Sequence, residues 1–272
     1  MPIRVSPISA FRDNYIWMIR ENGSNEVSVV DPGDSEPVLA VLRKEGLSLS
    51  SILITHHHAD HTGGVKTLLE HFPDVEIYGP MHGTFPIITA AVLDQDRLHV
   101  AGMDLRVIQV PGHTLDHIAY YCEIPNSPSA ETAETAGMLF CGDTLFAGGC
   151  GRIFEGSPDM MYNSLQKLAT LPPAIMVYCA HEYTQANLRF ALCVEPSNAD
   201  VIERLRQVSE ARNLEEPTVP SSLSLELRTN PFLRCHIHAV RKSVLESMAI
   251  SSASSDIEIF AALRRWKDNF SG

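Results

Sequence analysis

"SSILITHHHADHTGG", residues 50 to 64, joins a short apolar run to a cluster of four histidines and one aspartate. The apolar run is typical of a strand that is buried on both faces. The segment that follows the cluster, residues 63 to 72, has apolar side chains at helical spacing. Strand, cluster and helix in this order predict an α/β fold in which the histidines lie at the carboxyl end of a strand.

Composition excludes several classes of protein. The chain has 272 residues, of which 44% are hydrophobic and 20% are charged, so it can form one large domain or two smaller ones. No apolar run reaches the roughly 18 residues that a membrane span needs. The first 15 residues lack the pattern of a secretory signal or transit peptide, so we expect a cytoplasmic protein. The net charge of −12 disfavours nucleic-acid and membrane partners, and a monomer is the default expectation.

Strand-like segments occur in two rounds. The first round comprises residues 3–8, 14–20 and 26–31, which resemble an antiparallel meander, and a helix is predicted at about 35–45. The second round comprises five short apolar runs, which are "VEIYG", "LRVIQV", "HIAYYCEI", "MLFC" and "AIMVYC". Two rounds of strands with a few helices predict two packed sheets that are covered by helices.

The composition changes twice along the chain. Residues 125–137 are small and polar and contain prolines, so they are predicted to form a surface loop between two strands. After about residue 182 the strand signals disappear and helical spacing takes over. Ser255 and Glu258 are placed as a capping box at the start of the last helix.

The cluster carries the ligands of a metal site. Neutral imidazole and carboxylate suit divalent cations such as zinc. Along extended backbone His56 and His58 point to one side and His57 to the other, while Asp60 and His61 come from the turn into the helix. So many ligands do not fit around one tetrahedral ion, and the cluster therefore indicates two metals. A polar loop with chance histidines is the alternative, but its ionisable groups would be hard to satisfy beside an apolar strand.

Three more ligand-type residues each follow an apolar strand. They are His113, Asp143 and His181. An H-x-H-x-D-H motif followed by a later His, Asp and His resembles the metallo-β-lactamase superfamily over residues 1 to 181. The resemblance implies an αββα sandwich.

Further motifs resemble glyoxalase II, the hydroxyacylglutathione hydrolase family, along almost the whole chain. They are "DNYIWMI", "THHHADHTGG", "GDTLFAGGCGRIFEG", "HEYT", "EPTVPSSL", "NPFLR" and "RRWKD". The resemblance implies a catalytic domain at residues 1–181 and a helical, glutathione-binding domain at 182–272. It also implies that His56, His58 and His113 hold one metal, that Asp60, His61 and His181 hold the other, and that Asp143 bridges both. Zinc is the first expectation, and iron and manganese are alternatives.

The implied activity is hydrolysis of S-2-hydroxyacylglutathione, typically S-lactoylglutathione, to glutathione and D-lactate, which detoxifies methylglyoxal. A hydroxide bridging two metals would attack the thioester, with Asp60 and Asp143 as the catalytic residues. The family's substrate-binding positions match Arg152, Phe154, Tyr183, Arg264 and Lys267. Taken alone, the charges of "RRWKD" would be read as a solvated helix face.

Two positions depart from the family pattern. Phe154 stands where many relatives have Tyr, and it cannot donate a phenolic hydrogen bond. Asp116 stands where the "GHT-x-G-H" pattern has Gly. His117 is expected either to support His113 or to be a hydrogen-bonded core residue, and Cys150 to be a packing residue.

Other functions compete with this hypothesis. A persulfide dioxygenase shares the scaffold but uses one iron, and another binuclear metallohydrolase of the superfamily is a further alternative. The acidic net charge disfavours a nuclease, and β-lactamases commonly have other residues at the positions of Asp60 or Asp143. A non-catalytic metal- or glutathione-binding protein is the alternative from a different class. The set Asp60, Asp143 and His181, together with the helical tail, favours the binuclear hydrolase.

Overall fold

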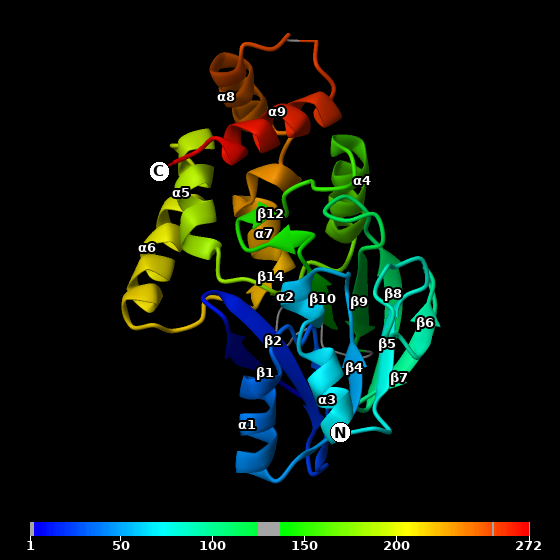
Figure 1. Ribbon diagram of the computed structural model, residues 1–272. Helices are drawn as coiled ribbons and strands as arrows, with labels where there is room; N and C mark the ends of the chain where they lie inside the picture. The colour runs from blue at the N-terminus through cyan, green and yellow to red at the C-terminus, as the bar shows by residue number, and fades with distance from the viewer. Residues whose placement is uncertain (1–2, 125–136, 252, 272) are drawn as a thin grey trace.

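The computed structural model describes residues 3–124, 137–251 and 253–271. Two sheets pack face to face, helices cover their outer faces, and the carboxyl-terminal helices gather at one end of the sandwich (Figure 1). This confirms the predicted αββα sandwich with a helical carboxyl-terminal region. The predicted surface loop lies, except for Gly137, outside the described residues.

The first sheet has six strands in sequence order. They are β1 (Ile3–Ala10), β2 (Asn14–Glu21), β3 (Glu26–Val30), β4 (Ser48–Leu53), β5 (Glu76–Pro80) and β6 (Ala90–Val92). The strands β1 to β3 form the predicted antiparallel meander, and β3 to β6 are parallel. The crossover from β3 to β4 contains α1 (Ser35–Glu45) and that from β4 to β5 contains α3 (Val65–His71), whereas residues 81–89 connect β5 to β6 without a helix.

The second sheet is built mainly from the second round of strands. Its order is β14 (Ser221–Ser222), β13 (Met176–Cys179), β10 (Gly137–Gly142), β9 (Ile118–Glu123), β8 (Met103–Gln109) and β7 (Arg97–Val100). A small ribbon, β11 (Leu145–Phe146) and β12 (Gly149–Cys150), follows β10, and α4 (Pro158–Ala169) precedes β13.

Side-chain alternation divides the core into two layers. In β2, Ile16 and Met18 join the apolar cluster beneath α1 and α3, whereas Trp17 and Ile19 point the other way into the core shared with the second sheet. Both faces of this sheet are therefore buried, which explains the continuous apolar run that precedes the histidines.

The remaining elements are mostly helical. They are α5 (Thr184–Val194), α6 (Ala199–Asn213), α7 (Leu223–Thr229), the 3-10 turn η1 (Pro231–Leu233), α8 (His238–Met248) and α9 (Asp256–Asp268). The capping box of Ser255 and Glu258 is present at the start of α9. The expectation that strands end near residue 182 is wrong at β14, which pairs with β13 and extends the second sheet. None of the described helices is both long and apolar enough to cross a bilayer.

Candidate active site

The predicted ligands converge where strands of the two sheets end. The histidine cluster follows β4, His113 follows β8, Asp143 follows β10 and His181 follows β13. A short helix, α2 (Ala59–Thr62), carries Asp60 and His61. The turn after β3 lies against this helix so closely that a Cβ on Gly33 would stand 1.8 Å from the carbonyl oxygen of Asp60, which only glycine permits.

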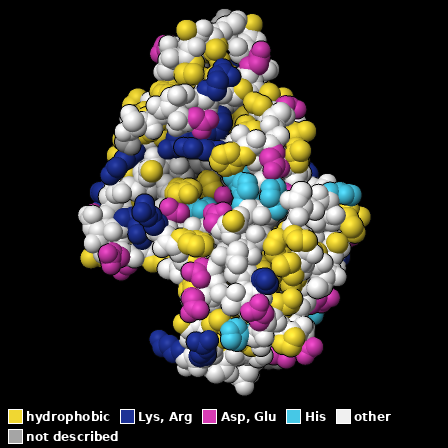
Figure 2. Space-filling view, viewed as in Figure 1, with side chains coloured by type: hydrophobic (Ala, Val, Ile, Leu, Met, Phe, Trp, Pro, Cys, Tyr) yellow, Lys and Arg dark blue, Asp and Glu magenta, His cyan; other side chains and the backbone are white. Residues whose placement is uncertain are grey.

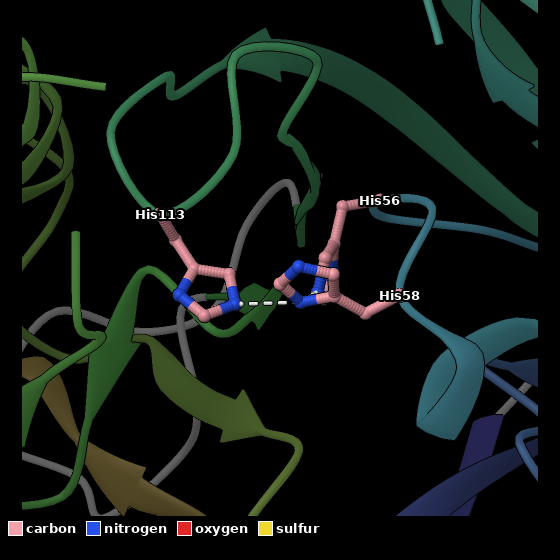
Figure 3. A group of neighbouring side chains, drawn as sticks. All are labelled: His56, His58 and His113. Carbon is pink, nitrogen blue, oxygen red and sulfur yellow. Dashed lines mark hydrogen bonds between the residues drawn. The ribbon is translucent and has the colours of Figure 1, made fainter. Parts of the chain in front are cut away.

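His56, His58 and His113 form a three-histidine group (Figure 3). The Nδ1 of His58 lies 3.1 Å from Nε2 of His56 and 3.0 Å from Nε2 of His113. The other ring nitrogens are already used, because Nδ1 of His56 donates to Thr55 Oγ1 and Nδ1 of His113 donates to the carbonyl of Arg152. Each Nε2 therefore presents a lone pair to the middle of the group.

The electrostatics of this group favour a cation. Burial and the neighbouring imidazoles hold the pKa of His56 well below its usual value, and burial also lowers the pKa of His58 and of His113. The rings are therefore neutral at physiological pH. Nδ1 of His58 faces the Nε2 lone pairs of His56 and His113 and can donate its proton to only one of them, so the donor set fits a metal ion between the rings.

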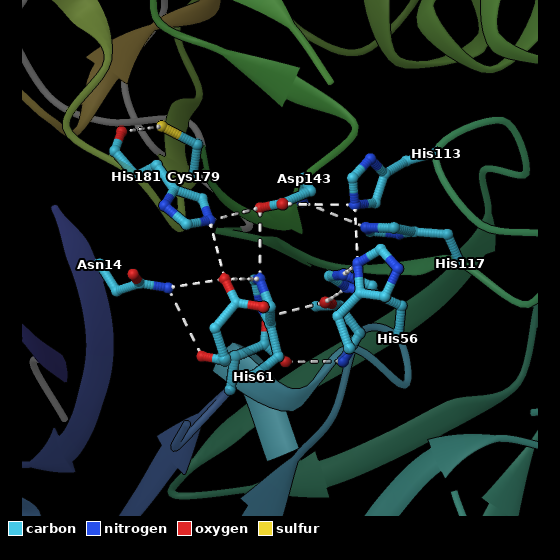
Figure 4. A network of polar contacts seen from close by, with 12 residues as sticks. Asn14, His56, His61, His113, His117, Asp143, Cys179 and His181 are labelled. Atoms are coloured by element: carbon cyan, nitrogen blue, oxygen red, sulfur yellow. Dashed lines mark hydrogen bonds and ion pairs between the residues drawn. The ribbon is translucent and has the colours of Figure 1, made fainter. Parts of the chain in front are cut away.

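Asp60, His61 and His181 form a second group, and their donor atoms lie within 4.8 Å of one another. Asp143 lies between the two groups (Figure 4). Its Oδ1 is 3.2 Å from Nε2 of His181 and 3.5 Å from Nε2 of His61, while its Oδ2 is 3.4 Å from Nε2 of His113. One carboxylate thus faces both groups, as a bridging ligand would.

The second group also fits a cation. Burial alone would lower the pKa of His61, but the carboxylates of Asp143 and Asp31 outweigh it and raise that pKa well above the usual value. For Asp143 the directions are reversed. Burial would raise the pKa of this carboxyl group, but His61 and His181 hold it well below the usual range. Protons on the histidines balance the buried carboxylate, and a divalent cation would do the same. In the part of the chain that the structure describes, Nε2 of His61 and Oδ1 of Asp143 lack a hydrogen-bond partner.

Carboxylates support the second group from behind. Asp31 Oδ2 lies 3.1 Å from Nδ1 of His61, so this carboxylate stands behind the His61 ring as an ion-pair partner. Asp13 Oδ1 accepts from Nδ1 of His181 at 2.8 Å, and the Asn14 amide donates to Asp60 Oδ2 at 3.2 Å. Neither Asp13 nor Asn14 is predicted as a support from the sequence, although both lie in the motif "DNYIWMI".

His117 and His57 have different roles. The Nε2 of His117 accepts from the backbone amide of Asp143 at 3.1 Å, so this histidine supports Asp143 and not His113. The ring of His57 faces away from both ligand groups, as predicted, and lies between Asp116 at 3.0 Å and Glu155 at 3.1 Å.

A pocket of about 490 Å³ opens beside His113 and Asp143. It is lined by residues of three regions, which are Phe146, Cys150, Arg152 and Phe154 after β10, Tyr183, Ala186 and Asn187 around the start of α5, and Arg264, Lys267, Asp268 and Phe270 at the end of the chain. Figure 2 shows a hollow in the face of the molecule, with Lys and Arg side chains along one edge and histidines at another. All five residues of the predicted substrate site lie at this pocket.

These five side chains are not equally available. Phe154 and Arg152 are largely exposed, whereas Arg264 is buried and donates to the carbonyl of Cys150 at 3.0 Å. Tyr183 stacks on His181, with ring centroids 4.7 Å apart. Burial lowers the pKa of Lys267, and the nearby Arg264 and Arg152 lower it further, so a bound anion would be favoured there.

Cys150 is packed against this cationic corner. Burial raises the pKa of its thiol to about 11, even though Arg264 opposes the shift. The thiol is therefore protonated at neutral pH, in keeping with the expectation of a packing residue.

Comparison with known proteins assigns the chain to a family. The model described as "Hydroxyacylglutathione hydrolase C-terminus" matches residues 182–270, and that of the metallo-beta-lactamase superfamily matches residues 10–181. The hydroxyacylglutathione hydrolase of Alkalilimnicola ehrlichii is 52% identical over 263 residues, which are 96% of this chain and 97% of that protein. The chain belongs to the hydroxyacylglutathione hydrolase family. The family member from Chromohalobacter salexigens is 47% identical over 98% of this chain and 100% of its own length.

Solved structures share the fold of this hydroxyacylglutathione hydrolase family member. ETHE1 from Myxococcus xanthus superposes with a TM-score of 0.61 at 22% identity, covering 98% of each chain. TTHA1623, solved in a di-iron-bound form, superposes with a TM-score of 0.57 at 25% identity, covering 84% of this chain and 100% of that one. These likenesses extend the agreement from sequence to architecture.

Proposed function

We propose that the protein hydrolyses the thioester of S-2-hydroxyacylglutathione, with S-lactoylglutathione as the principal substrate, and so yields glutathione and D-lactate in the detoxification of methylglyoxal. The observation that carries this proposal is the position of Asp143, whose two oxygens face two histidine-rich groups beside a pocket edged by cations. The names of the relatives, which agree along the full chain, support the hydrolase over a persulfide dioxygenase.

Two divalent ions per chain fit the donor set. His56, His58 and His113 would hold one ion, Asp60, His61 and His181 the other, and Asp143 would touch both. When bound, the ions supply a water of lowered pKa and positive charge to balance the oxyanion that forms at the thioester carbonyl. Zinc is the first choice and iron or manganese the alternatives, and the di-iron form of TTHA1623 supports a two-metal site.

The remaining side chains bind and orient the substrate. Glutathione carries two carboxylates at neutral pH, for which Arg152 and Lys267 at the pocket are suitable partners. Tyr183 can donate its phenolic hydrogen, and Phe154 offers an apolar surface. Arg264 would act mainly by fixing the backbone at Cys150, because its guanidinium is already engaged. The leaving thiol has a pKa near 8.5, so it departs without a dedicated general acid.

The two parts of the chain would have different roles. Residues 1–181 would form the catalytic domain, with Asp60 and Asp143 acting through the ions, and residues 182–272 would supply the greater part of the glutathione site. We propose that the protein acts as a monomer in the cytoplasm and that a small-molecule thioester is its partner.

The test is thioester hydrolysis by the purified, metal-loaded protein. We expect S-lactoylglutathione to be consumed, with two metal ions per chain by elemental analysis, and we expect Asp60→Ala to abolish turnover. Asp74→Ala, which removes an exposed carboxylate remote from the pocket, is the matched control and should retain full activity. Oxygen uptake with a single iron per chain, or no turnover at full metal occupancy, would exclude the proposed activity.

A further inference from the structure

His57 lies on the side of the histidine cluster that faces away from the metal ligands, yet its ring is held at both nitrogens. Nδ1 is 3.0 Å from both carboxylate oxygens of Asp116, and Nε2 is 3.1 Å from Oε1 of Glu155. The side chain of Asp116 is 6% exposed, so this contact is largely shielded from solvent. A shielded contact to a carboxylate resists screening more than a surface pair does.

Glu155 also binds the loop that carries His113. Its Oε2 accepts from the backbone amide of Leu115 at 2.9 Å. The carbonyl of His113 accepts from the amides of Phe154 at 3.2 Å and Glu155 at 3.4 Å, and Nδ1 of His113 donates to the carbonyl of Arg152 at 2.8 Å. Residues 152–155 are therefore fastened to the loop between β8 and β9, and His57 joins both segments to the loop after β4.

The joined segment forms one wall of the pocket. The Phe154 ring lies edge-on to His58, with centroids 5.7 Å apart, and to His113 at 5.2 Å. Phe154 is 63% exposed, so packing alone does not fix its position. The position of this ring, and of Arg152 beside it, depends on the backbone contacts of residues 152–155.

We propose that His57, held between Asp116 and Glu155, is a positioning residue that fixes residues 152–155 over the three-histidine group and so sets how substrate meets Arg152 and Phe154. Asp116 and Phe154 are the two positions that depart from the family pattern. Asp116 contacts His57 directly, and Phe154 is the chain neighbour of Glu155. A fixed Phe154 offers the substrate an ordered apolar contact in place of the phenolic hydrogen bond. We call the contacts of His57 with Asp116 and Glu155 the brace. The effect on substrate rests on the proposed thioesterase function, whereas the brace itself does not.

Removal of Glu155 tests the kinetic consequence. We expect Glu155→Ala to raise KM for S-lactoylglutathione about fivefold with kcat changed less than about twofold, because it loosens substrate binding and leaves the reacting groups in place. Glu155→Gln keeps a side chain that reaches both Leu115 and His57 and should recover most of the loss. His57→Ala should also raise KM, and the double variant should raise KM by less than the product of the two single effects, because both substitutions remove the His57–Glu155 contact. Asp104→Ala, which breaks the exposed His99–Asp104 pair of similar chemistry, should leave KM unchanged.

Hydrogen exchange tests the brace without any turnover. The amides of Leu115, Phe154 and Glu155 should exchange faster in Glu155→Ala than in the metal-loaded wild-type protein, and Asp104→Ala should leave them unchanged. If the wild-type protein fails to hydrolyse the thioester, the proposed function is wrong. The amide exchange rates would still show whether His57 and Glu155 hold residues 152–155 in place.

Three results would overturn the inference. The first is unchanged KM and unchanged amide exchange in Glu155→Ala. The second is a fall in kcat without a rise in KM. The third is a metal content above two ions per chain that drops in Glu155→Ala, since the donor atoms of His57, His58 and Glu155 lie within 4.8 Å of one another and would then be a third metal site.

Discussion

In a neutral histidine, the ring nitrogen that donates a hydrogen bond carries the proton, so the other nitrogen carries the lone pair. Thr55, the carbonyl of Arg152 and Asp13 each accept from the Nδ1 of a proposed ligand histidine, and this leaves Nε2 free to face the group centre. Such supports fix both the tautomer and the ring plane, so we expect them to raise metal affinity without touching the metal.

Asp13 is the support whose removal is most informative. Asp13→Ala leaves Nδ1 of His181 without its carboxylate acceptor, and we expect metal affinity to fall about 10- to 100-fold. Competition with a chromophoric chelator measures this fall. The loss should concern the second group, so one ion per chain should remain tightly held. Equal chelator competition in the wild type and Asp13→Ala would show that this contact does not support the ligand.

The seven proposed ligands could be predicted from the sequence, whereas their supports could not. The ligand residues follow apolar strands directly, and strand ends that meet at one edge bring them together. Asp13 lies 168 positions from His181, and β5 to β12 separate Glu155 from His57 along the chain. Only the packing of the two sheets brings these carboxylates to their partners, and the sequence pattern does not specify such packing.

Helix α9 is capped at its first turn and contributes two cations to the pocket from its last turns. Its first turn is closed by Ser255, which accepts from the amide of Glu258, while its last turns present Arg264 and Lys267 to the pocket. The helix packs on α4 and α8, so its register determines where both cations lie.

Loss of the cap should weaken α9 without changing its register. Ser255→Ala removes the acceptor for the Glu258 amide and should lower the free energy of unfolding by about 1 kcal/mol. Urea unfolding measures the change, and Ser255→Asp, which retains an acceptor at the cap, is the control. If Ser255→Ala and Ser255→Asp unfold at the same urea concentration, the cap does not stabilise the protein.

The sequence predicted this cap but not β14, for a physical reason. A capping box is defined by residues three positions apart, so the pattern contains all that is needed. A strand of two residues has no periodicity of its own, and Ser221–Ser222 becomes a strand only because β13 offers it backbone partners.

Across the whole molecule, one apolar core connects the sheets with the helical region. Phe140 in β10 and Leu165 in α4 belong to the same buried cluster as Phe232 and Phe260. A buried polar network crosses the same boundary, because Glu226 in α7 accepts from Arg204 in α6 and from the amide of Gly148 at 2.7 Å. The two regions therefore support each other physically.

Glu226 should be critical for stability. Glu226→Ala leaves the buried Arg204 guanidinium without its carboxylate, and we expect a loss of about 3–5 kcal/mol in the free energy of unfolding. Chemical denaturation followed by circular dichroism measures it. Glu203→Ala, which removes an exposed partner of Arg206 on α6, should cause no measurable change. Similar unfolding midpoints for both variants would contradict a structural role for the buried pair.

The pairing of β14 with β13 also has a consequence for synthesis of the chain on the ribosome. Every strand of the first sheet and every proposed metal ligand is made before residue 182, but the edge partner of β13 and the helices that complete the shared core are made last. Until then the nascent chain exposes an unpaired strand edge and apolar surface, the features that promote association between chains. The last third of the polypeptide therefore covers the strand edge and apolar surface of the preceding part, which contains the proposed metal ligands, and should reduce its aggregation once synthesis is complete.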